Sequence, residues 1–387
     1  MKILINTATV HVGGAVQVAR SLLEELKVHR AHQFAVVLGL PLQKELDVES
    51  FPDNFRFYPI SYRPATRFFD FRSASAFHRK VELVESPDVV FTTTGPAYWR
   101  PKCPHLVGYN LPHYIYPDSP FFTRLSWIRR LKFKLKGLII RNQFRKESDA
   151  IVGQTEDVAQ RGSEWLGIKR HFTVGNTCNA HYFRSVPSSV RVPHIKDNDV
   201  FKWLTISGYH THKNLESISK VAAELHRAAP GKHHFYVTLK SADYEKLYSE
   251  VEREWITNIG PVPSSEGPAL YHFCDGMFLP TLLECFSASY VEAMAMGRPI
   301  VTTNLSFAKI ICDSAAAYYS AESVQQAAKQ LERIRTDHSF REGLIQNGKE
   351  RMLEFPSATK RADMYLEACQ ALLREQQNEL KNGRSRQ

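Results

Sequence analysis

Short β-rich runs alternate with helical patterns along most of the chain, and this alternation constrains the fold more than any other feature of the sequence. Runs such as residues 34–40 are apolar at consecutive positions, as expected for strands of a parallel sheet that is covered on both faces. Because regular β–α alternation is typical of doubly wound sheets, we predict an α/β protein. The predicted strands are residues 2–8, 34–40, 56–61, 88–94, 105–110, 150–154, 172–175, 203–207, 235–239, 255–259, 276–279 and 299–303. The predicted helices are residues 15–29, 66–85, 122–146, 156–166, 214–229, 243–253, 265–273 and 288–296, followed by a helical tail.

The alternation is interrupted once, near the middle of the chain. Residues 185–199 are rich in proline, serine and charged residues, a composition typical of a linker. A chain of 387 residues has room for two domains of ordinary size on either side of it. We predict an N-terminal domain, a linker, a C-terminal domain and a final helical segment, spanning residues 1–185, 186–199, 200–355 and 356–387.

The excess positive charge lies in the first half of the chain. Residues 1–190 contain 26 Lys and Arg against 16 Asp and Glu, which accounts for the whole net charge of +10. This asymmetry indicates an anionic partner for the first half: a membrane surface, a phosphorylated substrate or a nucleic acid.

Much of this charge is concentrated in residues 124–146, which hold nine Lys and Arg and no acidic residue. A core helix with a solvated basic side would explain the pattern, but a helix lying on anionic lipid explains both the charge and the apolar stripe, and we favour it. The stripe, with steps of three and four residues, comprises Leu125, Ile128, Leu131, Leu135, Leu138 and Ile139, with Trp127 and Phe133 outside it. The predicted membrane-binding cations are Arg124, Arg129, Arg130, Lys132, Lys134 and Lys136.

Two glycines, Gly13 and Gly14, fall in the loop between the first predicted strand and the first predicted helix. Paired glycines let a backbone approach a ligand closely and can direct amides at a phosphate, although a lone pair of glycines is more often just a turn. The loop is neither GxGxxG nor a Walker A sequence, which weakens a dinucleotide or P-loop interpretation.

A second loop, residues 280–287, links a buried strand to an apolar helix. Glu292 inside that helix needs a polar partner, because burying an unpaired carboxylate is costly. The segment is either a helix cap with one satisfied glutamate or a ligand site. In the second case the helix N-terminus at Ser287 faces a phosphate, Glu284 lies near a sugar, and Glu292 accepts hydrogen bonds from ribose hydroxyls.

The pair Glu284 and Glu292 matches an E-x7-E signature, and the surrounding block resembles the retaining glycosyltransferases of family 4. Other segments resemble that family in the same order along nearly the whole chain. They are the glycine loop at Gly13, residues 148–155, residues 173–183, and the loop from Ser207 to Lys213.

The resemblance implies the GT-B fold, in which two Rossmann-like domains with parallel sheets face a central cleft and the second holds most of the nucleotide-sugar donor. It also implies that residues 356–380 cross back to the first domain. Two departures stand out: Cys285 and Ser287 replace the glycines that often flank Phe286, and no Arg precedes Lys213 in residues 208–212. The implied catalytic residues are Glu284, Lys213 and His113. The implied donor-binding residues are Gly13, Gly14, Gly208, Tyr209, His210, Lys213, Glu284, Cys285, Phe286, Ser287 and Glu292.

We predict no metal and no cofactor. The triplet at residues 197–199 mimics a metal-binding DxD motif, but it lies in the predicted linker and is more simply solvated charge. Six scattered cysteines show no CxxC pair and no zinc spacing, which favours reduced thiols in a cytosolic protein. The N-terminus lacks the apolar stretch of a secretory signal, and no run is long enough to span a membrane.

The resulting prediction is a retaining, metal-independent hexosyltransferase that moves a sugar from a nucleotide-sugar to a hydroxyl of an oligosaccharide or lipid-linked glycan, as in surface polysaccharide or lipopolysaccharide assembly. It would be cytoplasmic and peripheral on the cytoplasmic face of the membrane, with nucleic acid an improbable partner. Alternatives are a non-catalytic membrane- or nucleic-acid-binding protein on a degenerate GT-B scaffold, and a GT-B sugar-nucleotide epimerase or hydrolase.

Overall fold

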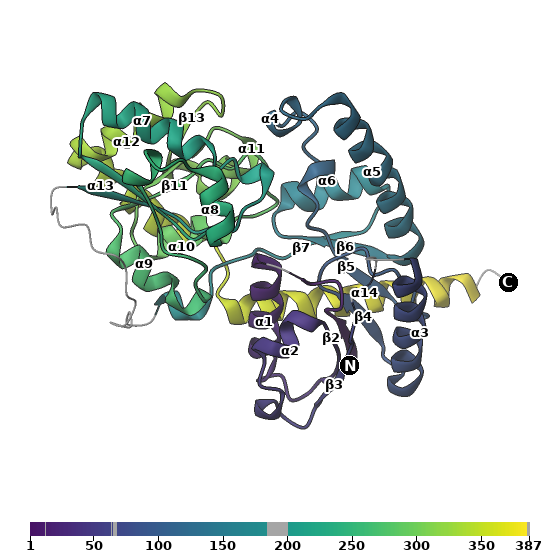
Figure 1. Ribbon diagram of the computed structural model, residues 1–387. Helices are drawn as coiled ribbons and strands as arrows, with labels where there is room; N and C mark the ends of the chain where they lie inside the picture. Colours follow the sequence, from purple (N-terminus) through teal and green to yellow (C-terminus); the bar gives the residue numbers. More distant parts are fainter. Residues whose placement is uncertain (12, 63, 65–67, 184–199, 385–387) are drawn as a thin grey trace. The chain divides into compact units, whose positions relative to one another are not determined.

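The computed structural model describes residues 1–11, 13–62, 64, 68–183 and 200–384 (Figure 1). The predicted linker, residues 186–199, lies outside the described residues. The chain forms two compact units. The first consists of Met1–Ile115, Ser126–Asn176 and Pro356–Gln387, and the second of Tyr116–Leu125 and Thr177–Phe355.

The first unit is built on a parallel sheet of seven strands, in the order β3-β2-β1-β4-β5-β6-β7. The strand order reverses beside β1, which pairs with both β2 and β4, and ligands of doubly wound sheets bind at such a reversal. The strands are β1 (Lys2–Asn6), β2 (Gln33–Leu38), β3 (Phe55–Pro59), β4 (Val89–Thr92), β5 (His105–Gly108), β6 (Ala150–Gly153) and β7 (His171–Thr173). The helices are α1 (Gly14–Leu26), α2 (Leu40–Glu45), α3 (Phe68–Glu85), α5 (Trp127–Glu147), α6 (Glu156–Leu166) and α14 (Ala358–Arg384), with 3-10 turns η1 (Val48–Ser50) and η2 (Pro112–Tyr114).

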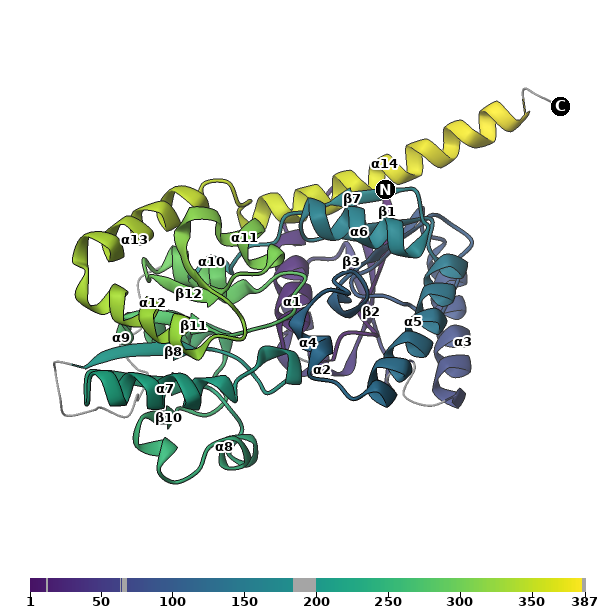
Figure 2. The ribbon, with the colours of Figure 1, turned by 90° about the horizontal axis from the view of Figure 1, so that it is seen from above.

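The final helix, α14, packs on α1 and β4 of the first unit (Figure 2). Its buried residues Ala362, Leu366 and Cys369 recur at helical spacing and join the apolar core beside the sheet. The buried Arg361 donates hydrogen bonds to Asn176 Oδ1 at 2.6 Å and Ser21 Oγ at 2.7 Å. These contacts explain why a segment that follows the second unit in sequence belongs to the first.

The second unit has a parallel sheet of six strands in the order β10-β9-β8-β11-β12-β13. Its strands are β8 (Phe201–Thr205), β9 (His233–Val237), β10 (Ile256–Asn258), β11 (Gly276–Leu279), β12 (Ile300–Thr303) and β13 (Ala316–Tyr319). Its helices are α4 (Pro120–Thr123), α7 (Ser217–Ala228), α8 (Ser241–Leu247), α9 (Gly267–Phe273), α10 (Ala288–Ala295), α11 (Ser306–Cys312), α12 (Val324–Thr336) and α13 (His338–Met352). Its 3-10 turns are η3 (Ala180–Phe183), η4 (Thr211–Lys213), η5 (Glu252–Glu254), η6 (Ser264–Glu266) and η7 (Asp313–Ala315).

The structure differs from the sequence prediction at the segment Tyr116–Leu125. The predicted N-terminal domain, residues 1–185, includes it, yet it packs with the second unit, where Ser119 Oγ donates a hydrogen bond to Leu282 O at 2.7 Å. Residues Thr177–Phe183 also lie in the second unit. The predicted helix over residues 122–146 is two helices, α4 and α5, and Ser126 caps the start of the second one.

Candidate functional site

The candidate site lies at the carboxyl edge of the second sheet, where the central strands β8 and β11 pair with each other. Ligands of open α/β sheets bind outside the carboxyl ends of strands, so the loops that follow these two strands are the expected place. The two loops are tied together, because Leu282 N donates a hydrogen bond to His212 O at 2.8 Å and Asn214 Nδ2 donates to Pro280 O at 3.1 Å.

Within these loops, Lys213 and Glu284 form an ion pair, with 2.5 Å between Lys213 Nζ and Glu284 Oε1. Thr281 Oγ1 donates a second hydrogen bond to the same carboxylate oxygen at 2.9 Å. Both charged side chains are largely buried, with exposed fractions of 17% and 10%. The structure therefore brings together two of the predicted catalytic residues and adds Thr281, which the sequence prediction did not single out.

The two histidines beside Lys213 do not add to its charge. Burial and the neighbouring Lys213 ammonium lower the pKa of His210 and lower the pKa of His212 to about 3. Their rings stack with centroids 5.5 Å apart. Both are therefore neutral near pH 7, so Lys213 alone among the three residues carries a positive charge at the site.

Glu292 of α10 meets two tyrosine hydroxyls. Tyr271 Oη donates to Glu292 Oε2 at 3.5 Å and to Ser289 O at 3.1 Å, and Tyr182 also hydrogen bonds to the carboxylate. Burial raises the pKa of Glu292 to about 7, although the two tyrosines and the charge of Lys213 oppose the shift. The polar partner that the sequence requires for this glutamate is thus a pair of tyrosines from α9 and η3.

The raised pKa of Glu292 predicts a pH-dependent effect of Glu292→Gln on stability. The folded state keeps a proton that the unfolded chain releases at lower pH, so the carboxyl's contribution to stability falls as pH rises towards about 7. We expect Glu292→Gln to raise the melting temperature, relative to wild type, more at about pH 8.5 than at about pH 5. Thermal scans without ligand would measure this. Exposed Glu245→Gln is the control, and an equal shift of Glu292→Gln at both pH values would contradict the prediction.

The remaining predicted donor-binding residues of the second unit lie on the same two loops. Cys285 and Ser287 are buried, and Phe286 contacts the Phe355 ring with centroids 6.1 Å apart. The Ser287 side chain does not cap α10, which leaves the amides of its first turn to another partner. A Cβ placed on Gly208 would meet nothing within 4 Å, and the adjacent Tyr209 packs against the core of the unit.

The other predicted site residues belong to the first unit. Gly13 precedes α1 with φ of +60°, a conformation that favours glycine, and a Cβ on either Gly13 or Gly14 would meet nothing within 4 Å. His113 lies in η2 and stacks on the Phe133 ring of α5 with centroids 5.3 Å apart. The structure thus places these three residues in the first unit and Lys213, Glu284 and Glu292 in the second.

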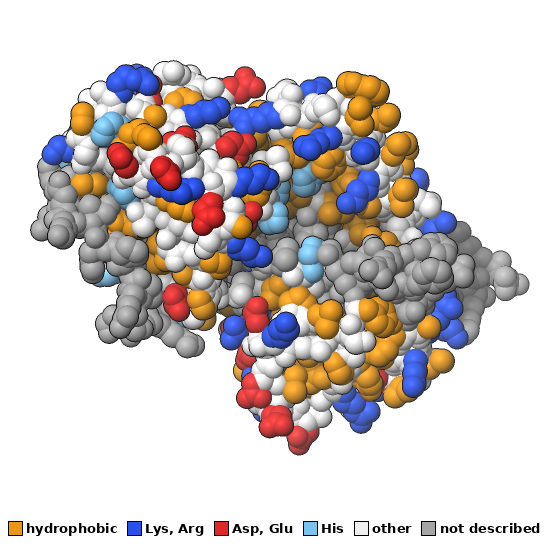
Figure 3. Space-filling model, in the orientation of Figure 1, with side chains coloured by type: hydrophobic (Ala, Val, Ile, Leu, Met, Phe, Trp, Pro, Cys, Tyr) orange, Lys and Arg blue, Asp and Glu red, His pale blue; other side chains and the backbone are white. Residues whose placement is uncertain are grey.

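The predicted membrane-binding helix exposes its apolar stripe. Its buried residues, Gly137, Ile140, Phe144 and Glu147, lie on the opposite side of α5. The alternative of a core helix that buries the stripe is therefore wrong. The exposed fractions are 73% for Trp127, 48% for Ile128, 49% for Leu131, 53% for Leu135, 62% for Leu138 and 70% for Ile139. Figure 3 shows hydrophobic and basic side chains gathered over this helix.

Two details of that prediction need correction. Arg124 lies before α5 and donates a hydrogen bond to Asn214 Oδ1 in the second unit, so it is not part of the basic helix. Leu125 is buried and belongs to the segment Tyr116–Leu125 of the second unit, so it is not part of the exposed stripe.

A family model described as "Glycosyl transferases group 1" matches residues 201–337, from the first strand of the second unit to the end of α12. Residues 201–337 are therefore similar to the group 1 glycosyltransferases. The Lys213, Glu284 and Glu292 side chains all lie inside the matched residues. A comparison with curated protein sequences finds no match.

Solved structures resemble this chain over nearly its whole length. Sucrose-phosphate synthase from Thermosynechococcus elongatus is 13% identical with a TM-score of 0.72, covering 97% of this chain and 100% of that one. Anabaena HepE, solved in complex with UDP and glucose, is 13% identical with a TM-score of 0.70, covering 96% and 100%. WaaG, a glycosyltransferase involved in lipopolysaccharide biosynthesis, is 14% identical with a TM-score of 0.68, covering 94% and 99%. The predictions of an α/β class and of the GT-B fold are confirmed.

Two kinds of feature are absent from the residues that the structure describes. No three His, Cys, Asp or Glu side chains among the described residues gather where they could hold a metal ion. Within the same residues, no helix combines the length and the apolar character needed to cross a membrane.

Proposed function

We propose that the chain is a retaining, metal-independent glycosyltransferase that moves a sugar from a nucleotide-sugar to a hydroxyl of a glycan acceptor. The observation that carries this proposal is the cluster of Lys213, Glu284 and Thr281 at the carboxyl edge of the second sheet, with Glu292 on the helix that follows. Its parts match what transfer from a nucleoside diphosphate requires: a cation and a helix N-terminus for the phosphates, and carboxylates for hydroxyl groups.

Lys213 would stabilise the leaving diphosphate. Its ammonium is paired with Glu284, and anionic phosphate oxygens would compete for the same donor. A positive group fixed where negative charge develops lowers the barrier because it need not reorganise during the reaction. The uncapped N-terminus of α10 adds backbone amides on the loop side of this cluster.

Glu284 would orient the donor sugar and not act as a nucleophile. Its carboxylate oxygen already accepts from both Lys213 and Thr281, which reduces its ability to attack carbon. This supports a retaining reaction in which the acceptor attacks from the same face as the departing phosphate, assisted by that phosphate. His113, on the first unit, is proposed to contact the reacting sugar.

Glu292 would hold the donor ribose, with Tyr182 and Tyr271 fixing the carboxylate. Glu292→Gln should weaken nucleotide binding by about 1–3 kcal/mol, the cost of a lost hydrogen bond to a charged group. Glu284→Gln should mainly lower turnover. UDP is the first nucleotide to test, because the structural neighbour HepE was solved with UDP.

The test is a thermal-shift screen with UDP, GDP, ADP and their sugar conjugates, followed by titration of both variants. A bound nucleotide raises the apparent stability by mass action. If no nucleotide shifts the melting temperature, the glycosyltransferase proposal is contradicted. Wild-type binding and turnover in both folded variants would remove the assignment of the two glutamates.

The acceptor is proposed to be lipid-linked, and the enzyme to be cytoplasmic and peripheral on the cytoplasmic face of the membrane. The supporting observation is α5, whose exposed apolar stripe lies opposite its buried face and between rows of cations. Such a helix lies in the interface of an anionic bilayer. WaaG, which acts in lipopolysaccharide biosynthesis, provides a precedent for the pathway.

A further inference from the structure

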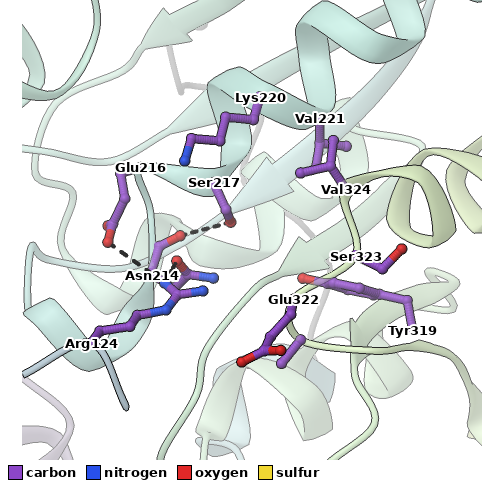
Figure 4. Close-up of a pocket in the computed structure, with 11 residues that line it drawn as sticks. Arg124, Asn214, Glu216, Ser217, Lys220, Val221, Tyr319, Glu322, Ser323 and Val324 are labelled. Carbon is purple, nitrogen blue, oxygen red and sulfur yellow. Dashed lines mark hydrogen bonds and ion pairs between the residues drawn. The ribbon is translucent and has the colours of Figure 1, made fainter. Parts of the chain in front are cut away.

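A cavity in the second unit lies apart from the proposed donor residues. It encloses about 310 Å³ between the start of α7, the turn from β13 into α12, and the Arg124 side chain (Figure 4). That volume is at the lower end of the range of about 300–1,000 Å³ for small-molecule sites. Lys213, Glu284 and Glu292 are not among the residues that line it. The lining side chains used below are Arg124, Asn214, Glu216, Lys220, Tyr319 and Glu322.

The hydroxyl of Tyr319 is the first indication of a ligand. Tyr319 is only 4% exposed, and its hydroxyl has no hydrogen-bond partner among the described residues. In Figure 4 this hydroxyl points towards the middle of the ring of lining residues. Burial raises the pKa of Tyr319, so the group keeps its proton and can both donate and accept. Buried polar groups are almost always hydrogen bonded, so an orphan facing a cavity indicates a missing partner.

The charges around the cavity indicate what that partner is. Arg124 and Lys220 are balanced by Glu216 and Glu322, so the lining has no net charge. Arg124 is already engaged, since it donates to Asn214 Oδ1 and lies 3.8 Å from Glu216. A phosphate group would therefore meet two carboxylates, and of the two cations beside it Arg124 is already paired, which makes its desolvation costly.

A neutral ligand with many hydroxyl groups suits the same lining. Each hydroxyl can donate to a carboxylate and accept from Lys220, Arg124 or the tyrosine, so both the cations and the anions gain partners. We propose that this cavity binds a neutral saccharide of one or two sugar rings, with Tyr319 and Glu322 as its main hydrogen-bonding residues.

The wall of this saccharide pocket is joined to the donor loop through one residue. Asn214 accepts from Arg124 on the pocket side, and its amide donates to Pro280 O at the start of the loop that carries Glu284. In the proposed transferase, the pocket would hold a sugar of the glycan remote from the bond that forms. That role rests on the proposed function, whereas saccharide binding itself does not.

The experiment is saturation-transfer NMR of the full chain with glucose, galactose, mannose, N-acetylglucosamine and maltose, without nucleotide. We expect at least one saccharide to bind in the millimolar range. Tyr319→Phe should weaken binding about three- to tenfold and Glu322→Gln about tenfold, as hydrogen bonds to neutral and charged groups are lost. Glu322 is exposed, so its variant is expected to fold.

The control separates this pocket from the donor site. Glu284→Gln should bind the saccharide like wild type, even if it loses transferase activity. The saccharide-pocket proposal and the transferase proposal can therefore be contradicted separately. The proposal is overturned if no saccharide binds, if Tyr319→Phe and Glu322→Gln both bind like wild type, or if Glu284→Gln abolishes binding. Binding of inorganic phosphate that depends on Lys220 would also overturn it, in favour of an anion site.

Discussion

Replacement of Lys213 by alanine should lower turnover by about 10²- to 10³-fold, the cost of removing one fixed group that stabilises charge in a transition state. The side chain reaches Glu284 across the two loops, and its neighbours His210 and His212 are neutral, so no other group of this cluster can take over the charge. Steady-state turnover with a saturating donor measures the effect.

Two comparisons make the Lys213 result interpretable. Lys213→Gln keeps most of the side-chain length and a donor for Glu284, so a similar loss in that variant assigns the effect to charge and not to a cavity or an unpaired carboxylate. His210→Ala and His212→Ala should lose much less activity. If either histidine variant is the most severe of the set, the charge role belongs elsewhere.

The positive charge at this cluster also bears on whether activity needs a metal ion. In the proposed transferase, Lys213 and the N-terminus of α10 would supply the positive potential that a divalent cation can supply to a leaving phosphate. Activity should therefore persist in EDTA, and complete loss that Mg²⁺ or Mn²⁺ restores would contradict the metal-independent proposal.

The sequence predicts most of the fold because buried parallel strands leave a strong local signal. β11 is the clearest case, since Gly276–Leu279 is predicted with the observed bounds. β13 is the strand that the sequence prediction misses, and a helical tail was expected there. Its residues Ala316–Tyr319 are two alanines, which are depleted in strands, and two tyrosines, so only half of its positions favour a strand.

Contacts between distant parts of the chain explain the other differences. Nothing local in Tyr116–Leu125 indicates that it packs with the second unit, because the contact is made by a hydrogen bond from Ser119 to the distant Leu282. Helical periodicity over residues 122–146 likewise does not reveal that the helix is interrupted before Trp127. The interruption arises because Ser126 caps the start of the second helix.

The sequence also predicts one part of the candidate site and leaves another part to the folded structure. The spacing of Glu284 and Glu292 marks both positions in the sequence, and their surroundings follow from one strand and one helix. The two tyrosines around Glu292 come from elements elsewhere in the chain, so only the folded structure brings them together. The neutral state of His212 likewise depends on burial, which the sequence around it does not reveal.

Membrane binding through α5 is the second prediction with a large expected effect. Changing four of its cations to glutamine should weaken binding to anionic vesicles by about 10³-fold, since each cation near such a surface contributes about 1 kcal/mol. Screening by salt should weaken wild-type binding in the same direction. Vesicle sedimentation over a range of salt and of anionic lipid content measures both effects. The four residues are Arg129, Arg130, Lys132 and Lys134, all of them exposed.

A matched control tests whether the position of the charges matters or only their number. Four exposed lysines of the second unit can be changed to glutamine with the same loss of net charge, and this variant should bind vesicles nearly as well as wild type. These lysines are Lys240, Lys246, Lys309 and Lys329. Nucleotide binding should be unchanged in the α5 variant, because no cation of α5 belongs to the second unit.

The exposed stripe provides an independent variant of the same prediction. Changing Leu131, Leu135 and Leu138 to serine keeps every charge but removes apolar area worth about 25 cal/mol per Å² when it enters the lipid. These side chains are exposed, so the change should lower the melting temperature only slightly, through the weaker helix propensity of serine, while it reduces vesicle binding. Unchanged binding in the stripe variant would mean that only charge attracts the helix to the surface. If the wild type does not bind anionic vesicles even at low salt, the exposed stripe has another partner and the proposed membrane location is wrong. The transferase proposal does not depend on that result.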